Sequence, residues 1–146
     1  FILKYFLGES EEDNKILNEF AKKHNCKIID IGDSSSKYYN IGPSEFLYLE
    51  KNADLVVTDS FHSCVFALLF NTPLVMYKRN EVGENDMYSR METLIKKFDL
   101  KDMEYKGKLD DNILNVNVVK IEKFLDLERE KADKYLERFL KNDWNI

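Results

Sequence analysis

Short apolar runs alternate along the chain with longer segments in which apolar residues recur every three or four positions. The first pattern is typical of buried strands and the second of helices that pack by one face. Strands are therefore predicted at residues 1–7, 26–31, 55–58 and 73–77. Helices are predicted at about 11–24, from Gly42-Pro43-Ser44 onward, and at 61–70, 87–98 and 118–141. Residues 100–117 have the weakest pattern, which predicts at most one short strand.

Strands that alternate with helices predict an α/β fold, in which a parallel sheet carries helices on both faces. The length of 146 residues suits one domain with one core, so a single domain over residues 1–146 is expected. In such sheets a ligand binds beyond the carboxyl ends of the strands. That rule directs the search for function to Gly8-Glu9 and to residues 32–36, 59–63 and 78–90.

Composition excludes several classes of function. The net charge of −5 argues against a nucleic-acid partner, and no apolar run approaches the roughly 20 residues of a membrane helix. Cys26 and Cys64 form no CxxC pair, so a metal site has no support and both thiols are expected to be buried. The chain begins at Phe1 inside a predicted strand. We therefore expect it to be the C-terminal part of a longer protein, inactive without the N-terminal domain.

The stretch from Asp54 to Ser63 has the clearest chemical potential, because a β-branched strand passes directly into polar residues and then a helix. Asp59 or Ser60 is expected to cap that helix, whose first free N–H groups favour an anion. His62 falls in the first turn, where it could donate to a phosphate or act as a general acid or base. The alternative is that His62 only caps the helix or packs against the sheet.

Two cations beyond the fourth strand are further candidates. Arg90 starts a predicted helix after a charged loop and could bind a phosphate or carboxylate with its planar fork. The alternative is a surface arginine or an ion pair with Glu81 or Glu84. Lys78 follows the fourth strand and has a suitable place but a weak signal. Cys64 lies two residues from His62, on another side of the helix, so it is expected to be core.

Three segments resemble the polysaccharide pyruvyl transferase family. They are Gly42-Pro43-Ser44-Glu45-Phe46, then Asn52-Ala53-Asp54-Leu55-Val56-Val57-Thr58-Asp59-Ser60-Phe61-His62-Ser63, and Val65-Phe66-Ala67-Leu68-Leu69-Phe70-Asn71-Thr72-Pro73. Ser89-Arg90-Met91-Glu92-Thr93-Leu94 is similar to a Ser-Arg-x-Glu-Thr-Leu segment in one branch of that family. The resemblance covers about residues 42–100, less than half of the chain. One departure is Phe61, where some characterised members carry an arginine.

The resemblance implies the C-terminal, Rossmann-like domain of a two-domain fold like that of the GT-B glycosyltransferases. It implies transfer of a pyruvyl group from phosphoenolpyruvate to a sugar of a bacterial surface polysaccharide, such as a capsule, without a cofactor or metal. His62 would be the catalytic residue, and Ser60, the backbone at Ser63, Arg90 and Lys78 would bind the substrate.

Two alternatives to that reaction stay open: a glycosyltransferase that uses a nucleotide-sugar, and a non-catalytic interaction domain of a polysaccharide-biosynthesis protein. The acceptor would be a saccharide, lipid-linked in one version of the hypothesis. The expected location is the cytoplasm, at the inner face of the membrane in that version.

Overall fold

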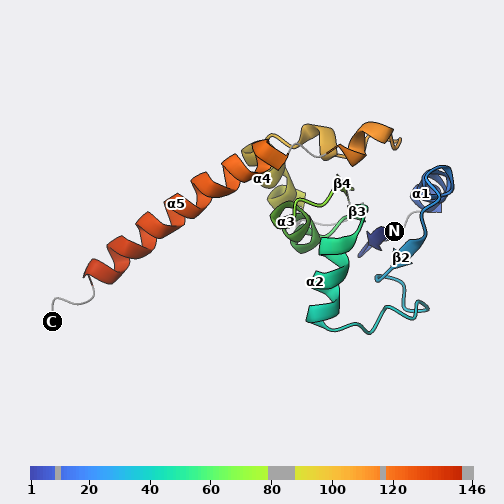
Figure 1. Cartoon of the computed structure of the whole chain (residues 1–146), viewed down its shortest axis with the longest axis horizontal. Helices are drawn as coiled ribbons and strands as arrows, with labels where there is room; N and C mark the ends of the chain where they lie inside the picture. Colours follow the sequence, from blue (N-terminus) through green and yellow to red (C-terminus); the bar gives the residue numbers. More distant parts are fainter. Residues whose placement is uncertain (9–10, 79–87, 116–117, 143–146) are drawn as a thin grey trace. The chain divides into compact units, whose positions relative to one another are not determined.

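The computed structural model describes residues 1–8, 11–78, 88–115 and 118–142 (Figure 1). The chain divides into two compact units, Phe1–Val116 and Asn117–Ile146, and each is described by itself. The first unit holds the sheet, and the second consists of helix α5, Val118–Asn142. The single domain expected over residues 1–146 stays a prediction.

The sheet of the first unit has four parallel strands in the order β2-β1-β3-β4. Their register pairs Ile2 of β1 with both Ile28 of β2 and Leu55 of β3, and Val56 of β3 with Leu74 of β4. Every residue of β3 and β4 is buried, which explains why their sequences are apolar without alternation. The predicted α/β, Rossmann-like class is confirmed. The strands are β1 (Ile2–Tyr5), β2 (Ile28–Asp30), β3 (Leu55–Thr58) and β4 (Leu74–Met76).

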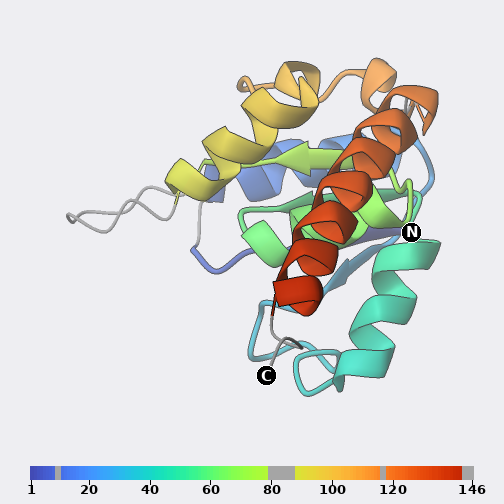
Figure 2. The same ribbon diagram turned by 90° about the vertical axis from the view of Figure 1, so that its left-hand side faces the viewer.

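Helices cover both faces of this sheet. The chain moves from β1 to β2 in one direction and then returns past β1 to β3, so right-handed crossovers place the first helix and the next two on opposite faces. Figures 1 and 2 show α1 on one face and α2 and α3 on the other. On the α1 face, Leu17 and Phe20 join Ile2, Leu55 and Val57 in a buried cluster. The helices are α1 (Glu11–Lys23), α2 (Pro43–Asn52), α3 (Phe61–Leu69) and α4 (Tyr88–Phe98).

The segment after α4 differs from the prediction. In place of a short strand it has two 3-10 helices, η1 (Lys101–Met103) and η2 (Asp111–Leu114), and one isolated parallel bridge between Met76 and Glu104. The Tyr105 N–H donates to the Met76 carbonyl oxygen at 2.8 Å, and the Tyr105 ring stacks on Tyr77 with ring centres 4.0 Å apart. The segment is therefore held to β4 by a short backbone contact together with side-chain stacking.

Helix α5 carries ion pairs between residues three or four positions apart. They include Arg129–Asp126 at 2.8 Å, Lys131–Glu128 at 2.7 Å and Lys134–Glu130 at 2.5 Å. Such solvated pairs contribute little each, but they support a long helix. No helix within the described ranges has the length and apolarity needed to cross a membrane.

Gly32 provides a test of how closely the strand ends approach one another. A Cβ at Gly32 would collide with the carbonyl oxygen of Phe6, a backbone atom that cannot move without displacing the end of β1. We expect Gly32→Ala to lower the free energy of unfolding by about 1–3 kcal/mol, the usual cost of overpacking. Urea unfolding measures the change.

Gly42→Ala is the matched control. A Cβ there would lie 2.8 Å from the carboxylate tip of Glu45, a flexible side chain that can move aside. An equal loss of stability in both variants would contradict the explanation.

Candidate functional site

The carboxyl ends of β1 and β3 form the switch point of this sheet. The two strands are neighbours, but the chain leaves β1 toward β2 on one side and reaches β3 on the other. In open parallel sheets the diverging connections leave a crevice at such a point. The residues that directly follow the two strands lie there: Phe6 to Gly8 after β1, and Asp59 and Ser60 after β3.

Asp59 joins the two strand ends. Its carboxylate accepts hydrogen bonds from the backbone N–H of Leu7 at 2.8 Å and of Gly8 at 3.0 Å. The Thr58 hydroxyl adds a second tie by donating to the carbonyl oxygen of Tyr5 at 2.6 Å. Asp59 is only 7% exposed, so its carboxylate serves as a fixed structural anion for the loop after β1.

The start of α3 has no side-chain cap among the described residues, which corrects the expectation that Asp59 or Ser60 would supply one. Asp59 turns toward β1, and Ser60 stands at the N-cap position with extended backbone while its N–H donates to the Thr58 hydroxyl at 3.0 Å. The first N–H with an acceptor inside the helix is that of Cys64, bonded to the Ser60 carbonyl at 3.1 Å. The N–H groups of the first turn thus keep the anion-binding potential of an uncapped helix end.

A pocket of about 450 Å3 adjoins this helix end. Ser60 and His62 line it together, and His62 is exposed. Most of the remaining lining is apolar or aromatic, as is usual for pockets that bind small molecules. It comes from the ends of β1 and β2, from the connection between β2 and α2, and from the start of α2: Tyr5, Leu7, Ile31, Tyr39, Ile41, Gly42, Pro43 and Phe46.

The other predicted site residues lie outside that pocket. Ser63 is buried, and its hydroxyl donates to Glu50, so only its backbone N–H is placed for the predicted role. The Arg90 guanidinium lies 5.2 Å from the centre of the Phe61 ring, beside the first turn of α3. Lys78 is exposed directly after β4 and its neighbour Tyr77. Arg79, Glu81 and Glu84 lie outside the described residues.

Comparison with known protein families identifies the chain. A family model described as polysaccharide pyruvyl transferase matches residues 1–81, more than half of the 146 residues. The chain belongs to the polysaccharide pyruvyl transferase family. No curated protein and no solved structure gives a significant match. The matched range includes Ser60, His62 and Lys78 and ends before Arg90.

This pyruvyl transferase family member contains a buried carboxyl group that sequence analysis missed. Glu50 of α2 is fully buried, its Oε1 accepts the hydrogen bond from the Ser63 hydroxyl, and its Oε2 has no partner within the described ranges. Burial raises the pKa of Glu50 to about 7, against the smaller opposing effect of the Ser63 bond. The spacing of Phe46, Glu50 and Ala53, four and then three residues apart, was the signal that placed Glu50 on the buried face.

The two cysteines behave as free thiols. Cys64 is fully buried, as predicted, and burial together with the negative charges of Glu50 and Asp59 raises its pKa far above the ordinary value. A thiol in that state is inert, which removes a thiol–imidazole pair with His62 from consideration. Cys26 is only half-buried, which corrects the expectation that both are core.

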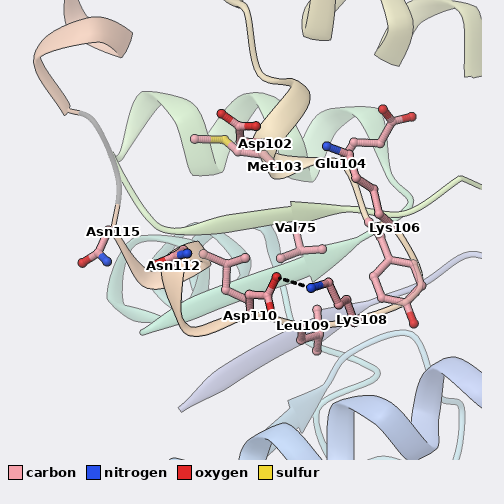
Figure 3. A pocket seen from close by; sticks show the side chains of 12 residues that line it. Val75, Asp102, Met103, Glu104, Lys106, Lys108, Leu109, Asp110, Asn112 and Asn115 are labelled. Carbon is pink, nitrogen blue, oxygen red and sulfur yellow. Dashed lines mark ion pairs between the residues drawn. The ribbon is translucent and has the colours of Figure 1, made fainter.

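A second pocket, of about 430 Å3, lies along the edge formed by β4 and the segment 102–115 (Figure 3). Both acidic and basic side chains line it, and Lys108 pairs with Asp110 at 3.1 Å. It contains no residue predicted to bind substrate. Within the described ranges, no three potential ligands gather in a way that could hold a metal ion.

Glu50 gives the first unit a defined pH dependence. Below its ordinary pKa of 4.5 the carboxyl is protonated in both states, and as the pH rises toward 7 only the unfolded chain releases the proton. The free energy of unfolding should therefore fall between about pH 4.5 and pH 7. The loss contributed by a shift from 4.5 to about 7 is about 3 kcal/mol.

Glu50→Gln isolates this contribution, because it keeps the shape of the neutral acid and does not titrate. Urea unfolding of both proteins from pH 5 to pH 8 should show Glu50→Gln gaining stability relative to the parent as the pH rises. A constant difference between the two proteins would show that Glu50 is ionised in the folded protein throughout this range, so that burial does not raise its pKa.

Proposed function

We propose that this protein transfers the pyruvyl group of phosphoenolpyruvate to two hydroxyls of a saccharide, forming a cyclic ketal and releasing phosphate. The observation that carries the proposal is a coincidence of two independent features. Residues 1–81 match the family, and within that range Ser60 and His62 line one pocket at the switch point of the sheet. An exposed His62 in a pocket also disfavours the alternative of a non-catalytic interaction domain.

The phosphate and carboxylate of the donor suit the start of α3. The first-turn N–H groups face outward from an uncapped helix end, where the helix dipole favours an anion. Asp59 accepts the N–H groups of Leu7 and Gly8, which directs its carboxylate toward the loop after β1. Arg90, held beside Phe61, supplies a planar cation for the same donor.

His62 would move the protons of the reaction. It donates one proton to the methylene carbon of phosphoenolpyruvate, which becomes a methyl group, while one sugar hydroxyl adds to the central carbon and gives its proton back to His62. The second hydroxyl then forms the second C–O bond at that carbon, the C–O bond to phosphate breaks, and the remaining proton leaves with phosphate. The aromatic lining from Tyr5, Tyr39 and Phe46 offers apolar surface for the sugar ring.

The remaining parts of the proposal extend beyond this chain. A second, N-terminal Rossmann-like domain would close the cleft opposite the α3 end, as in the two-domain GT-B architecture. The acceptor would then lie between the domains. Lys78, directly after β4 at the carboxyl edge of the sheet, would add positive charge to the donor side.

His62→Ala tests the chemistry. We expect kcat of the full-length protein for ketal formation to fall by roughly 10²–10⁴-fold, the usual loss for a general acid–base residue. The melting temperature should hold, because His62 is exposed and makes few core contacts. His62→Asn should retain donor binding, since its amide can still hydrogen-bond phosphate. A folded, fully active His62→Ala enzyme would remove the assignment.

Arg90→Lys tests the donor site. A point charge cannot reproduce a two-pronged contact with an oxyanion, so the KM for phosphoenolpyruvate should rise by about 10-fold with little change in melting temperature. The same protein is assayed with nucleotide-sugars as the alternative donor. Transfer of a glycosyl group in place of pyruvate would refute the proposed reaction and support the glycosyltransferase.

A further inference from the structure

The first turn of α3 is held by a contact that involves neither the pocket nor a helix cap. The Ser63 hydroxyl, one residue after His62, donates to Oε1 of Glu50 on α2, and both side chains are fully buried. Helix α2 packs against α3, and the Thr72 hydroxyl beyond α3 donates to the Glu50 carbonyl oxygen at 2.9 Å. Glu50 is therefore bonded on both sides of α3, through its side chain at the start and its backbone at the end.

We propose that Glu50 is a positioning residue of the proposed active site, where its bond to Ser63 fixes the rotation of the first α3 turn and so the placement of His62. The inference rests on the proposed function. A hydrogen bond is directional, whereas apolar packing at the same place would let the turn rotate. With no side-chain cap on α3 among the described residues, the Glu50–Ser63 bond is a buried polar restraint on its first turn.

Small displacements of the His62 side chain should have a large effect on the rate of the proposed reaction. Proton transfer requires His62 within hydrogen-bond reach of the reacting group, and a shift of about 1 Å can cost 10²-fold in rate. Burying a carboxyl group also costs desolvation free energy, which a pair of apolar residues at the same place would avoid. The structure thus retains a costly group at a position that hydrogen-bonds the turn carrying His62.

The charge state of Glu50 gives the proposal its distinctive readout. Ser63 and Cys64 of α3 face Glu50, and Asp59 contributes a second negative charge near Cys64. Among the described residues no cation contributes to the pKa of Glu50, which burial raises to about 7. Ionisation above that pH leaves an uncompensated buried charge between α2 and α3, which should loosen the packing of the two helices although the ionised carboxylate accepts the Ser63 hydroxyl more strongly.

The test compares four variants of the full-length protein in ketal formation from phosphoenolpyruvate. Glu50→Leu and Ser63→Ala should each lower kcat by about 10-fold or more with a smaller change in KM, because they affect placement of His62 and not donor contacts. The double variant should be no slower than the slower single one, since both remove the same bond. Glu50→Gln keeps an acceptor for Ser63 and should rescue most of the rate.

Thr72→Val is the matched control. It removes a buried hydrogen bond to the same residue at the far end of α3, so it should lower the melting temperature without lowering kcat. In the parent enzyme part of the rate should be lost as the pH rises through about 7, and Glu50→Gln should lack that loss. If Glu50→Leu, or Ser63→Ala in case Glu50→Leu does not fold, keeps the parent kcat and pH profile, Glu50 is only a core residue and the proposal is wrong.

A second measurement separates this proposal from the proposed reaction. If the parent protein forms no ketal, the backbone amide and imidazole NMR resonances of His62 are compared in Ser63→Ala, Glu50→Leu and Thr72→Val. Shifts in the first two variants and none in the third support positioning even when the reaction is wrong. His62 resonances that stay unmoved in all three would overturn the positioning role whatever the substrate.

Discussion

The carboxylate of Asp59 links two strand ends that are distant in sequence and adjacent in the sheet. By accepting the N–H groups of Leu7 and Gly8, it holds the loop after β1 against the end of β3. The Thr58 hydroxyl strengthens the same junction through the Tyr5 carbonyl. The start of α3 and His62 follow Asp59 within three residues, and Leu7, which Asp59 holds, lines the pocket together with Ser60 and His62.

The bonds of Asp59 to the loop after β1 also bear on why the first turn of α3 has no side-chain cap among the described residues. A side chain that capped the helix would satisfy its first N–H groups and reduce their attraction for an anion. Asp59 is instead bonded to β1, and Ser60 leaves the helix end uncapped while lining the pocket. The carboxylate of Asp59 stays at the strand junction, and the start of α3 keeps an uncapped N-cap beside the pocket.

The two sides of α3 carry different roles. Ser60 and His62 face the pocket, whereas Ser63 and Cys64 are buried between α3 and its neighbours. Pocket-lining and buried residues are neighbours within one turn of the helix, so the geometry of the pocket depends on how the buried side is packed. Glu50 is the polar group on that buried side, and Arg90 approaches the same turn from α4 through the Phe61 ring.

Periodicity alone determined the order and type of the elements. The short apolar runs specified the strands, and the spacing in 11–24 and 61–70 specified α1 and α3, because a buried strand and a one-faced helix need different repeats. The alternation of strands and helices also located the crevice, and with it Ser60 and His62. The segment 100–117 was not predictable in this way, since its shape follows from where Tyr105 finds a partner on the core.

Contacts between distant residues were decided only by the tertiary structure. Asp59 and Ser60 have good intrinsic preference for capping, but the N–H groups of Leu7 and Gly8 offered Asp59 two partners at once, and that competition is invisible along the chain. Glutamate is usually a surface residue; the spacing along α2 indicates that Glu50 lies on the buried face, but only the tertiary structure gives it Ser63 as a partner. The sequence thus determined which strands and helices meet at the candidate site, because the spacing of apolar residues specifies each element. Tertiary packing decided the hydrogen-bond partners of the polar groups there, because those partners come from segments distant in sequence.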